Sequence, residues 1–253
     1  MIAMCDAPMP GAVFLDLYGV LADSRVMVLR YRQRQAEILQ RQFGGSLDAW
    51  LTVHDEGWTW YQGQGAKLDA LPGNARDGDA WVAAVDDMEG RYVRFLFERA
   101  GLPPPADPTR FAHDLETEVV RGIDALYPDA RPTLKALRAA GYTLHLSTNA
   151  SRSNAESAVL ASGVRDQFDT LCLLEVTKSK KDRPYYWRQA FHLAGIDPPE
   201  AIAVDDVAAF LAPAAALGSR CFQILRPDRA GQTRGPWPVL ESLAELPEML
   251  QGP

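Results

Sequence analysis

The sequence predicts an α/β fold, in which a doubly wound, Rossmann-like parallel sheet forms the core and an all-helical domain is inserted into it. Two observations support this class. Short apolar runs without an amphipathic period alternate with helical segments, as in a sheet whose parallel strands are joined by right-handed helical crossovers. Between the first two runs, residues 24–126 show helical periodicity and no convincing strand alternation.

Five apolar runs predict the strands of the core. The first, AVFL at residues 12–15, is followed by Asp16 and Gly19, which is typical of a buried strand that ends in a turn. The other runs are at residues 142–146, 170–174, 201–204 and 221–225. The helices predicted between them cover residues 131–140, 154–162, 185–194 and 208–217.

The insertion between the first two strands is predicted to consist of helices. We expect helices at residues 30–43, 81–99 and 108–120, and one that begins near Leu47 with Ser46 as its N-cap. Residues 57–78 are rich in Gly and aromatic side chains, and no regular structure is predicted for them. The expected domains are therefore a core of residues 1–23 and 127–253 and a helical insertion of residues 24–126.

Composition excludes several classes of function. The chain has 26 Lys+Arg against 33 Asp+Glu and a formal net charge of -7, whereas a surface that follows nucleic-acid phosphates needs clustered Lys and Arg. The three cysteines have no paired spacing, so they fit neither a disulfide framework nor a zinc knuckle. The N-terminal residues resemble neither a signal peptide nor a membrane span. We expect a cytoplasmic monomer or homodimer that binds a small molecule and neither nucleic acid nor membrane.

Polar residues gather where the predicted strands end. Asp16 follows the first strand, Thr148-Asn149 the second, and Asp205-Asp206 the fourth, while a lysine-rich segment at residues 178–181 follows the third. Open parallel sheets bind ligands beyond the carboxyl ends of their strands. A carboxylate can attack phosphorus or carbon, and lysine and Mg²⁺ can offset the charge of the group under attack. Each part of such a site has a candidate here.

These segments resemble, in order, the four motifs of the haloacid dehalogenase-like (HAD) hydrolase superfamily. The motif of the nucleophilic Asp and its glycine turn is matched by FLDLYGVLADS at residues 14–24, and the phosphate-binding Ser/Thr motif by LHLSTNAS at residues 144–151. The lysine motif is matched by KDRPYYWRQAF at residues 181–191, and the acidic metal motif by AIAVDDVAAFLAPAAALG at residues 201–218. The insertion directly after the first motif looks like a type 1 helical cap of that superfamily.

The resemblance implies a role for each matching position. Asp16 corresponds to the nucleophile, and Thr148, with Asn149 beside it, to the residues that bind the transferring group. Counting back from the aspartate pair identifies Lys181, rather than the lysines within residues 178–180, as the family lysine.

A metal site is implied as well. The superfamily binds Mg²⁺ through positions that correspond here to Asp16, Asp206 and the backbone carbonyl of Tyr18. Asp205 lies beside them, either as a further ligand in an outer shell or as a cap of the following turn.

Two positions depart from the pattern of the HAD phosphatases. Those enzymes have a second Asp two residues after the nucleophile, where this chain has Tyr18, a poor base at neutral pH that can hydrogen-bond or donate a proton. Asp-x-Tyr-Gly is similar instead to the metal-independent 2-haloacid dehalogenases of the superfamily, although these have Thr where Val20 stands and lack a site like Asp205-Asp206. Paired carboxylates beside Asp16 repel one another unless a cation neutralises them, which favours the metal.

The sequence thus predicts a Mg²⁺-dependent phosphatase that acts on a small phosphomonoester through an aspartyl-phosphate. One alternative is a dehalogenase in which Asp16 attacks the carbon that bears the halide, and another is a non-catalytic binder of phosphorylated ligands. The helical cap would exclude water and select the leaving group. Arg30, His54 and Asp55 are its candidates to reach the site.

Overall fold

The core of the protein is a six-stranded parallel sheet. The structure, a computed structural model, describes residues 11–229 and 231–251, except for the side chains of residues 74 and 251. Within these ranges the strand order is β3-β2-β1-β4-β5-β6, and all neighbours pair in parallel. The strands are β1 (Ala12–Leu15), β2 (Thr143–Ser147), β3 (Thr170–Cys172), β4 (Ala201–Asp205), β5 (Arg220–Ile224) and β6 (Val239–Leu240). The predicted fold class is confirmed; β6 was not predicted, because two residues carry no apolar pattern.

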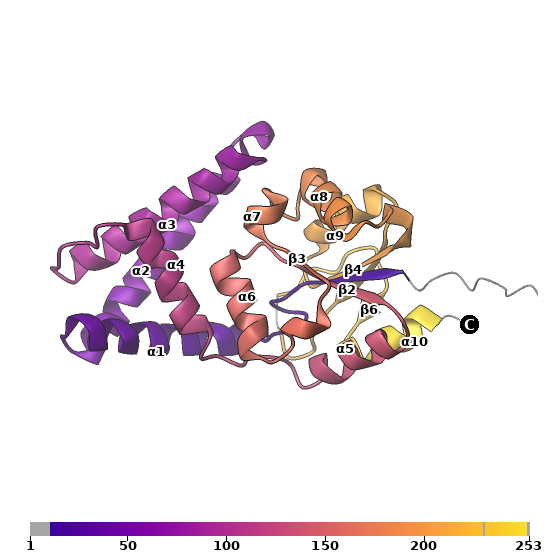
Figure 1. Ribbon diagram of the computed structural model, residues 1–253, viewed down its shortest axis with the longest axis horizontal. Helices are drawn as coiled ribbons and strands as arrows, with labels where there is room; N and C mark the ends of the chain where they lie inside the picture. Colours follow the sequence, from indigo (N-terminus) through magenta and orange to yellow (C-terminus); the bar gives the residue numbers. More distant parts are fainter. Residues whose placement is uncertain (1–10, 230, 252–253) are drawn as a thin grey trace, which may run out of the picture.

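Helices cover both faces of the sheet (Figure 1). Because side chains alternate along a strand, Ala12 and Phe14 of β1 pack with Trp187 on one face, and Val13 and Leu15 join the cluster on the other. The helices of the core are α5 (Ala130–Ala139), α6 (Arg152–Ala161), α7 (Leu174–Thr177), α8 (Pro184–Ala194), α9 (Ala208–Ala216) and α10 (Leu246–Gln251). Short 3-10 turns are η1 (Gly73–Ala75), η2 (Arg165–Gln167), η3 (Pro198–Glu200) and η4 (Leu243–Glu245).

Both cysteines within the described ranges are buried free thiols. Cys172 ends β3, and Cys221 lies in β5. They agree with the expectation of unpaired cysteines, and Cys5 lies outside the described residues.

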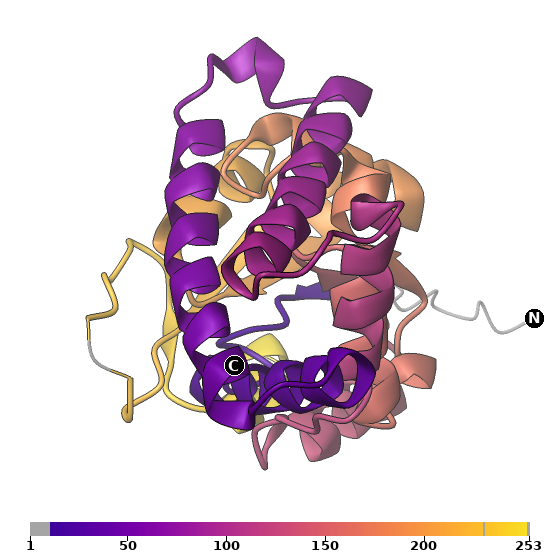
Figure 2. The same cartoon turned by 90° about the vertical axis from the view of Figure 1, so that its left-hand side faces the viewer.

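Four helices form the insertion, which lies beside the sheet in Figure 1 and faces the viewer in Figure 2. They are α1 (Ser24–Phe43), α2 (Leu47–Asp69), α3 (Asp79–Arg99) and α4 (Pro108–Val120). α1 begins earlier than predicted because the side chain of Asp23 accepts a hydrogen bond from the backbone N–H of Arg25 and so caps the helix at that point. Ser46 caps α2 as expected. The domain limits at residues 24 and 126 stay a prediction.

Most of the segment without predicted structure is helix. α2 continues through three glycines to Asp69. Gly57 is required by packing, because a Cβ atom there would lie 2.4 Å from the Cδ2 atom of the buried Leu96 on α3. The glycine that weakens a helix prediction therefore lets two long helices approach each other.

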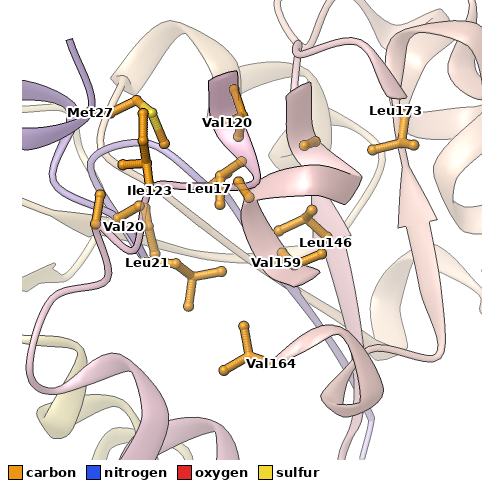
Figure 3. Packing of buried hydrophobic residues seen from close by; sticks show 14 of the residues in the cluster. Leu17, Val20, Leu21, Met27, Val120, Ile123, Leu146, Val159, Val164 and Leu173 are labelled. Carbon is orange, nitrogen blue, oxygen red and sulfur yellow. The ribbon is translucent and has the colours of Figure 1, made fainter. Parts of the chain in front are cut away.

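The two links between the insertion and the core share one apolar cluster (Figure 3). Leu17, Val20 and Leu21 follow β1, and Val120 and Ile123 lie where the chain returns from α4. All five side chains are fully buried. Val20 therefore has a packing role at the base of the insertion.

A second connection joins the tip of the insertion to the loop between α7 and α8. The carboxylate of Asp77 accepts bonds from Arg183 Nε and Nη2 at 2.7 and 2.6 Å and from Ser179 Oγ at 2.5 Å. Further ion pairs join Arg76 to Asp182 at 2.7 Å, Lys180 to Asp69 at 2.8 Å and Lys178 to Asp79 at 2.5 Å. We call this set of contacts the tip–loop contact. It attaches the insertion to the loop that carries Lys181.

Replacement of Asp77 tests the tip–loop contact. Asp77→Asn should lower the free energy of unfolding by about 1–2 kcal/mol, because it weakens a two-pronged arginine pair that is partly shielded from water. Asp69→Asn is the matched control, since the Asp69 carboxylate is more exposed and pairs with a single lysine, and the expected loss is under ~1 kcal/mol. Urea denaturation measures both. Equal losses in the two variants would contradict the special weight given to Asp77.

Candidate active site

Three adjacent strands bring the predicted site residues to one edge of the sheet. β2, β1 and β4 are neighbours, and Leu15 at the end of β1 pairs with Leu146 of β2 and Val204 of β4, so the three strands end at the same edge. The N–H of Asp16 donates to the carbonyl of Val204 at 3.1 Å, so Asp16 lies beside Asp205 at the end of β4. Thr148 follows β2. The strand order reverses at β1, which is where open α/β sheets form their ligand crevice.

Lys181 is the centre of the site. Its side chain is 1% exposed, and its Nζ lies 2.5 Å from Asp16 Oδ1 and 2.6 Å from Asp205 Oδ2. Nζ also donates to the carbonyl of Ser147 at 3.3 Å. The backbone is held in place because the side-chain carbonyl of Asn149 accepts the N–H of Lys181 at 2.8 Å. One buried ammonium thus joins the ends of three strands.

The charges of the site are strongly coupled. Burial raises the pKa of Asp16 to about 8, since the lowering by Lys181 is opposed by the nearby carboxylates of Asp205 and Asp206. Burial likewise raises the pKa of Asp205. For Lys181, burial lowers the pKa, but the two carboxylates outweigh it and the pKa is raised. The lysine therefore keeps its charge, and Asp16 needs a further positive charge nearby to be ionised at neutral pH.

Asp206 has a partner that sequence reasoning missed. Arg229, in the loop after β5, places Nη1 2.6 Å from Asp206 Oδ2. Gly19 makes room for the pair, because a Cβ atom there would lie 2.3 Å from both partners, and its φ of 98° favours glycine. The signal was available: Arg229 follows the fifth strand at the same edge of the sheet.

The carboxylates fit a divalent cation. Asp16, Asp205 and Asp206 each offer an oxygen within 4.8 Å of the others, and carboxylates are the ligands that Mg²⁺ prefers. Asp205 already uses both oxygens, Oδ2 for Lys181 and Oδ1 for the N–H of Val207. Asp16 Oδ2 and Asp206 Oδ1 accept no hydrogen bond from the described residues. Asp16 and Asp206 are thus the better ligands, and Asp205 fits a role through Lys181.

Tyr18 and Thr148 turn toward neighbours other than the carboxylates. The hydroxyl of Tyr18 donates to Asn154 Oδ1 at 2.5 Å. Burial, and after it Glu116 and Asp16, raise the pKa of Tyr18 far above its usual value, so the phenol stays protonated at neutral pH in the free protein. The Oγ1 of Thr148 accepts the N–H of Ala150 at 3.2 Å. The catalytic and binding roles given to both residues stay predictions.

A cavity of about 350 Å³ lies between the insertion and the core. Of the residues around Asp16 and Lys181, Tyr18 and Asn149 line it. The insertion contributes mainly aromatic side chains together with Glu89 and Glu116. Glu116 accepts hydrogen bonds from the hydroxyls of Ser151 and Ser153 and the amide of Asn154, all from the core, and Glu89 accepts one from Tyr61.

Only one of the three candidates in the insertion lines this cavity. His54 does so, with Nδ1 2.5 Å from Gln35 Oε1, and burial lowers its pKa to about 4. Arg30 donates to the carbonyl of Asp124, and Asp55 pairs with Arg32 at the surface. His54 is therefore a neutral part of the cavity wall.

A family model for haloacid dehalogenase-like hydrolases matches residues 10–218. The chain belongs to this family. It is thus a hydrolase of the HAD superfamily, as its motifs predicted. Of its helices, none within the described ranges is both long and apolar enough to cross a bilayer.

Its relatives include two kinds of enzyme. The chain is 25% identical over 249 residues to (S)-2-haloacid dehalogenase 1 of a Pseudomonas species, covering 96% of this chain and 97% of that protein. It is 33% identical over 96 residues to the pyrophosphatase PpaX of Bacillus velezensis, which is 38% of this chain and under half, 43%, of that protein. A solved HAD phosphatase from Thermococcus onnurineus aligns over 96% of this chain and 98% of its own, with 20% identity and a TM-score of 0.61.

Replacement of Glu89 tests the electrostatics of the cavity. Burial and Glu116 raise the pKa of Glu89 to about 8. The folded protein therefore holds this proton more tightly than the unfolded chain, and the contribution of Glu89 to stability falls as pH rises from about 4.5 to 8. Glu89→Gln removes this loss.

The measurement is urea denaturation of both proteins at pH 5.5 and 8. Relative to the wild type, the free energy of unfolding of the variant should rise by about 1.4 kcal/mol or more between pH 5.5 and pH 8. This amount, about 1.4 kcal/mol, is the free energy of one pKa unit. A constant difference between the two proteins at both pH values would show that Glu89 is not titrating there.

Replacement of Arg229 tests its competition for Asp206. Arg229→Gln removes a cation from a carboxylate that fits a metal, so the Kd for Mn²⁺, a paramagnetic substitute for Mg²⁺, should fall about tenfold, or about 1.4 kcal/mol. Electron paramagnetic resonance measures the free ion. Arg234→Gln, in the same loop, is the control. Weaker Mn²⁺ binding in Arg229→Gln would mean that the guanidinium orients Asp206 for the metal.

Proposed function

We propose that this protein is a Mg²⁺-dependent phosphatase that cleaves a small phosphomonoester through an aspartyl-phosphate on Asp16. The observation that carries the proposal is the cluster of three buried carboxylates whose oxygens lie within 4.8 Å, with Lys181 between two of them. Lys181 and Arg229 leave one negative charge uncompensated, and a phosphate dianion adds two more. Such a site needs a further cation to accept this substrate.

In this proposal each residue of the site has its own role. Asp16 attacks phosphorus, the bond from phosphorus to the oxygen of the leaving alcohol breaks, and water then hydrolyses the acyl phosphate. Lys181 and Thr148 bind the transferring group, and Asn149 fixes the lysine through its backbone N–H. Asp16, Asp206 and the carbonyl of Tyr18 are the proposed ligands of Mg²⁺, which supplies charge neutralisation and polarises the phosphoryl oxygens.

The leaving oxygen needs a proton, and we assign its transfer to Tyr18. Tyr18 lines the cavity into which the leaving group would extend, and its hydroxyl would release Asn154 to donate there. The raised pKa of Tyr18 keeps the phenol protonated in the free protein, so it holds a proton to give. The phenolate formed by donation would regain a proton from the water that hydrolyses the acyl phosphate.

A second candidate is a 2-haloacid dehalogenase. It is favoured by Tyr18, because a departing halide needs no proton donor, and by the full-length relative with that activity. The lining of the cavity argues against a dehalogenase. A 2-haloacid brings its own carboxylate, and the lining of the cavity within the described residues holds Glu89 and Glu116 but no lysine or arginine.

Release of phosphate from an aryl phosphate tests the proposal. We expect release with Mg²⁺, loss of release with EDTA, and a loss of about a thousandfold or more in Asp16→Asn, which lacks the nucleophile. Asp166→Asn, which changes an exposed acid in the turn η2 before β3, should match the wild type, and any release left in Asp16→Asn measures contaminating phosphatase.

Two results would reject the phosphatase. One is phosphate release that persists in Asp16→Asn. The other is metal-independent chloride release from 2-chloropropionate that requires Asp16, which would instead establish the dehalogenase.

A further inference from the structure

The cavity next to Asp16 is where the rest of a substrate would lie. Tyr18, two residues after Asp16, forms part of its wall, and so does Asn149, which holds Lys181. Its volume of about 350 Å³ is within the range of ~300–1,000 Å³ found for small-molecule sites. The side chains of its wall therefore select what is attached to the reacting group.

The described wall of the cavity holds two glutamates and no lysine or arginine. Glu89 and Glu116 line the cavity, and neither forms an ion pair with a described residue. The one lining histidine, His54, is neutral at pH 7 because burial lowers its pKa to about 4. A second anionic group on the substrate would meet repulsion here.

Within the described residues, Glu89 uses only one of its two carboxylate oxygens. One of its oxygens accepts the hydroxyl of Tyr61 at 2.6 Å, and the other accepts no hydrogen bond from the part of the chain that the structure describes. Glu116, by contrast, is held by three neutral donors. A carboxylate taken out of water without a cation is costly, so a bound cation at Glu89 would be stabilising.

Aromatic side chains form a further part of the wall, alongside aliphatic and polar ones. Tyr31, Trp58, Tyr61 and Tyr92 come from three different helices of the insertion. Trp58 and Tyr61 stack with ring centroids 5.8 Å apart and an interplanar angle of 7°. Aromatic faces beside carboxylates form a favourable environment for organic ammonium groups, through cation–π attraction and charge complementarity.

We propose that this cavity binds an organic ammonium group, and that the substrate is accordingly the phosphate ester of an amino alcohol or of its quaternary ammonium form. The identity of the ester rests on the proposed phosphatase function. The binding of the ammonium group does not, because it depends only on the wall of the cavity.

Binding of two isosteric probes tests the cavity directly. Choline and its uncharged analogue 3,3-dimethylbutan-1-ol have the same shape, so they differ in charge alone. Isothermal titration of the full-length protein at pH 8.5, where Glu89 is more than half ionised, should give a Kd for choline at least about tenfold lower. Equal affinities, or tighter binding of the neutral alcohol, would overturn the proposal.

Variants locate the effect in the wall. Glu89→Gln and Glu116→Gln should each reduce the preference for choline about threefold or more, since each removes a negative charge without changing size. Glu98→Gln, an exposed acid on the same helix as Glu89, is the matched control. Unchanged preference in both cavity variants would place choline elsewhere and overturn the assignment.

Hydrolysis separates this inference from the proposed function. With Mg²⁺, kcat/KM for phosphocholine should exceed that for 3,3-dimethylbutyl phosphate about tenfold or more. Equal rates would reject the ammonium ester as substrate while leaving the phosphatase intact. Selective binding of choline, with no phosphate released from any ester, would reject the phosphatase and leave the ammonium site.

Discussion

The ammonium of Lys181 between Asp16 and Asp205 is the interaction on which the rest of the site depends. A buried ion pair of this kind contributes little net stability when complete, but the loss of one partner leaves an uncompensated charge in the interior. The lysine therefore fixes which carboxylate oxygens remain free. It leaves Asp16 with one open oxygen and uses Asp205 entirely, so that chemistry is confined to one side chain.

The insertion and the core divide recognition between them. In the core, the cations Lys181 and Arg229 pair with the carboxylates at the strand ends. The described residues that line the cavity include carboxyl groups and aromatic rings but no lysine or arginine. A substrate with opposite charges at its two ends would match this polarity from one end to the other. Under the proposed function, charge distribution would discriminate between candidate substrates more than shape alone.

The sequence predicted the sheet and most of the site because both depend on local signals. Apolar runs followed by Asp16, Thr148 and Asp205 are legible along the chain, and parallel topology brings their ends together. Arg229 was not predicted, because it lies after the fifth strand and outside the four motifs. The direction of the Tyr18 side chain and the acidic cavity wall were out of reach, since they arise from helices whose mutual packing no local pattern encodes.

The tip–loop contact links the position of the insertion to the charge of Asp16. Asp77 and Arg183 tie the position of the insertion to the loop that supplies Lys181, the counter-ion of Asp16. A displacement of the insertion that broke this contact would also release the outer anchor of that loop, and with it part of what holds the charge of Asp16. The position of the insertion and the protonation of Asp16 are therefore linked through one carboxylate.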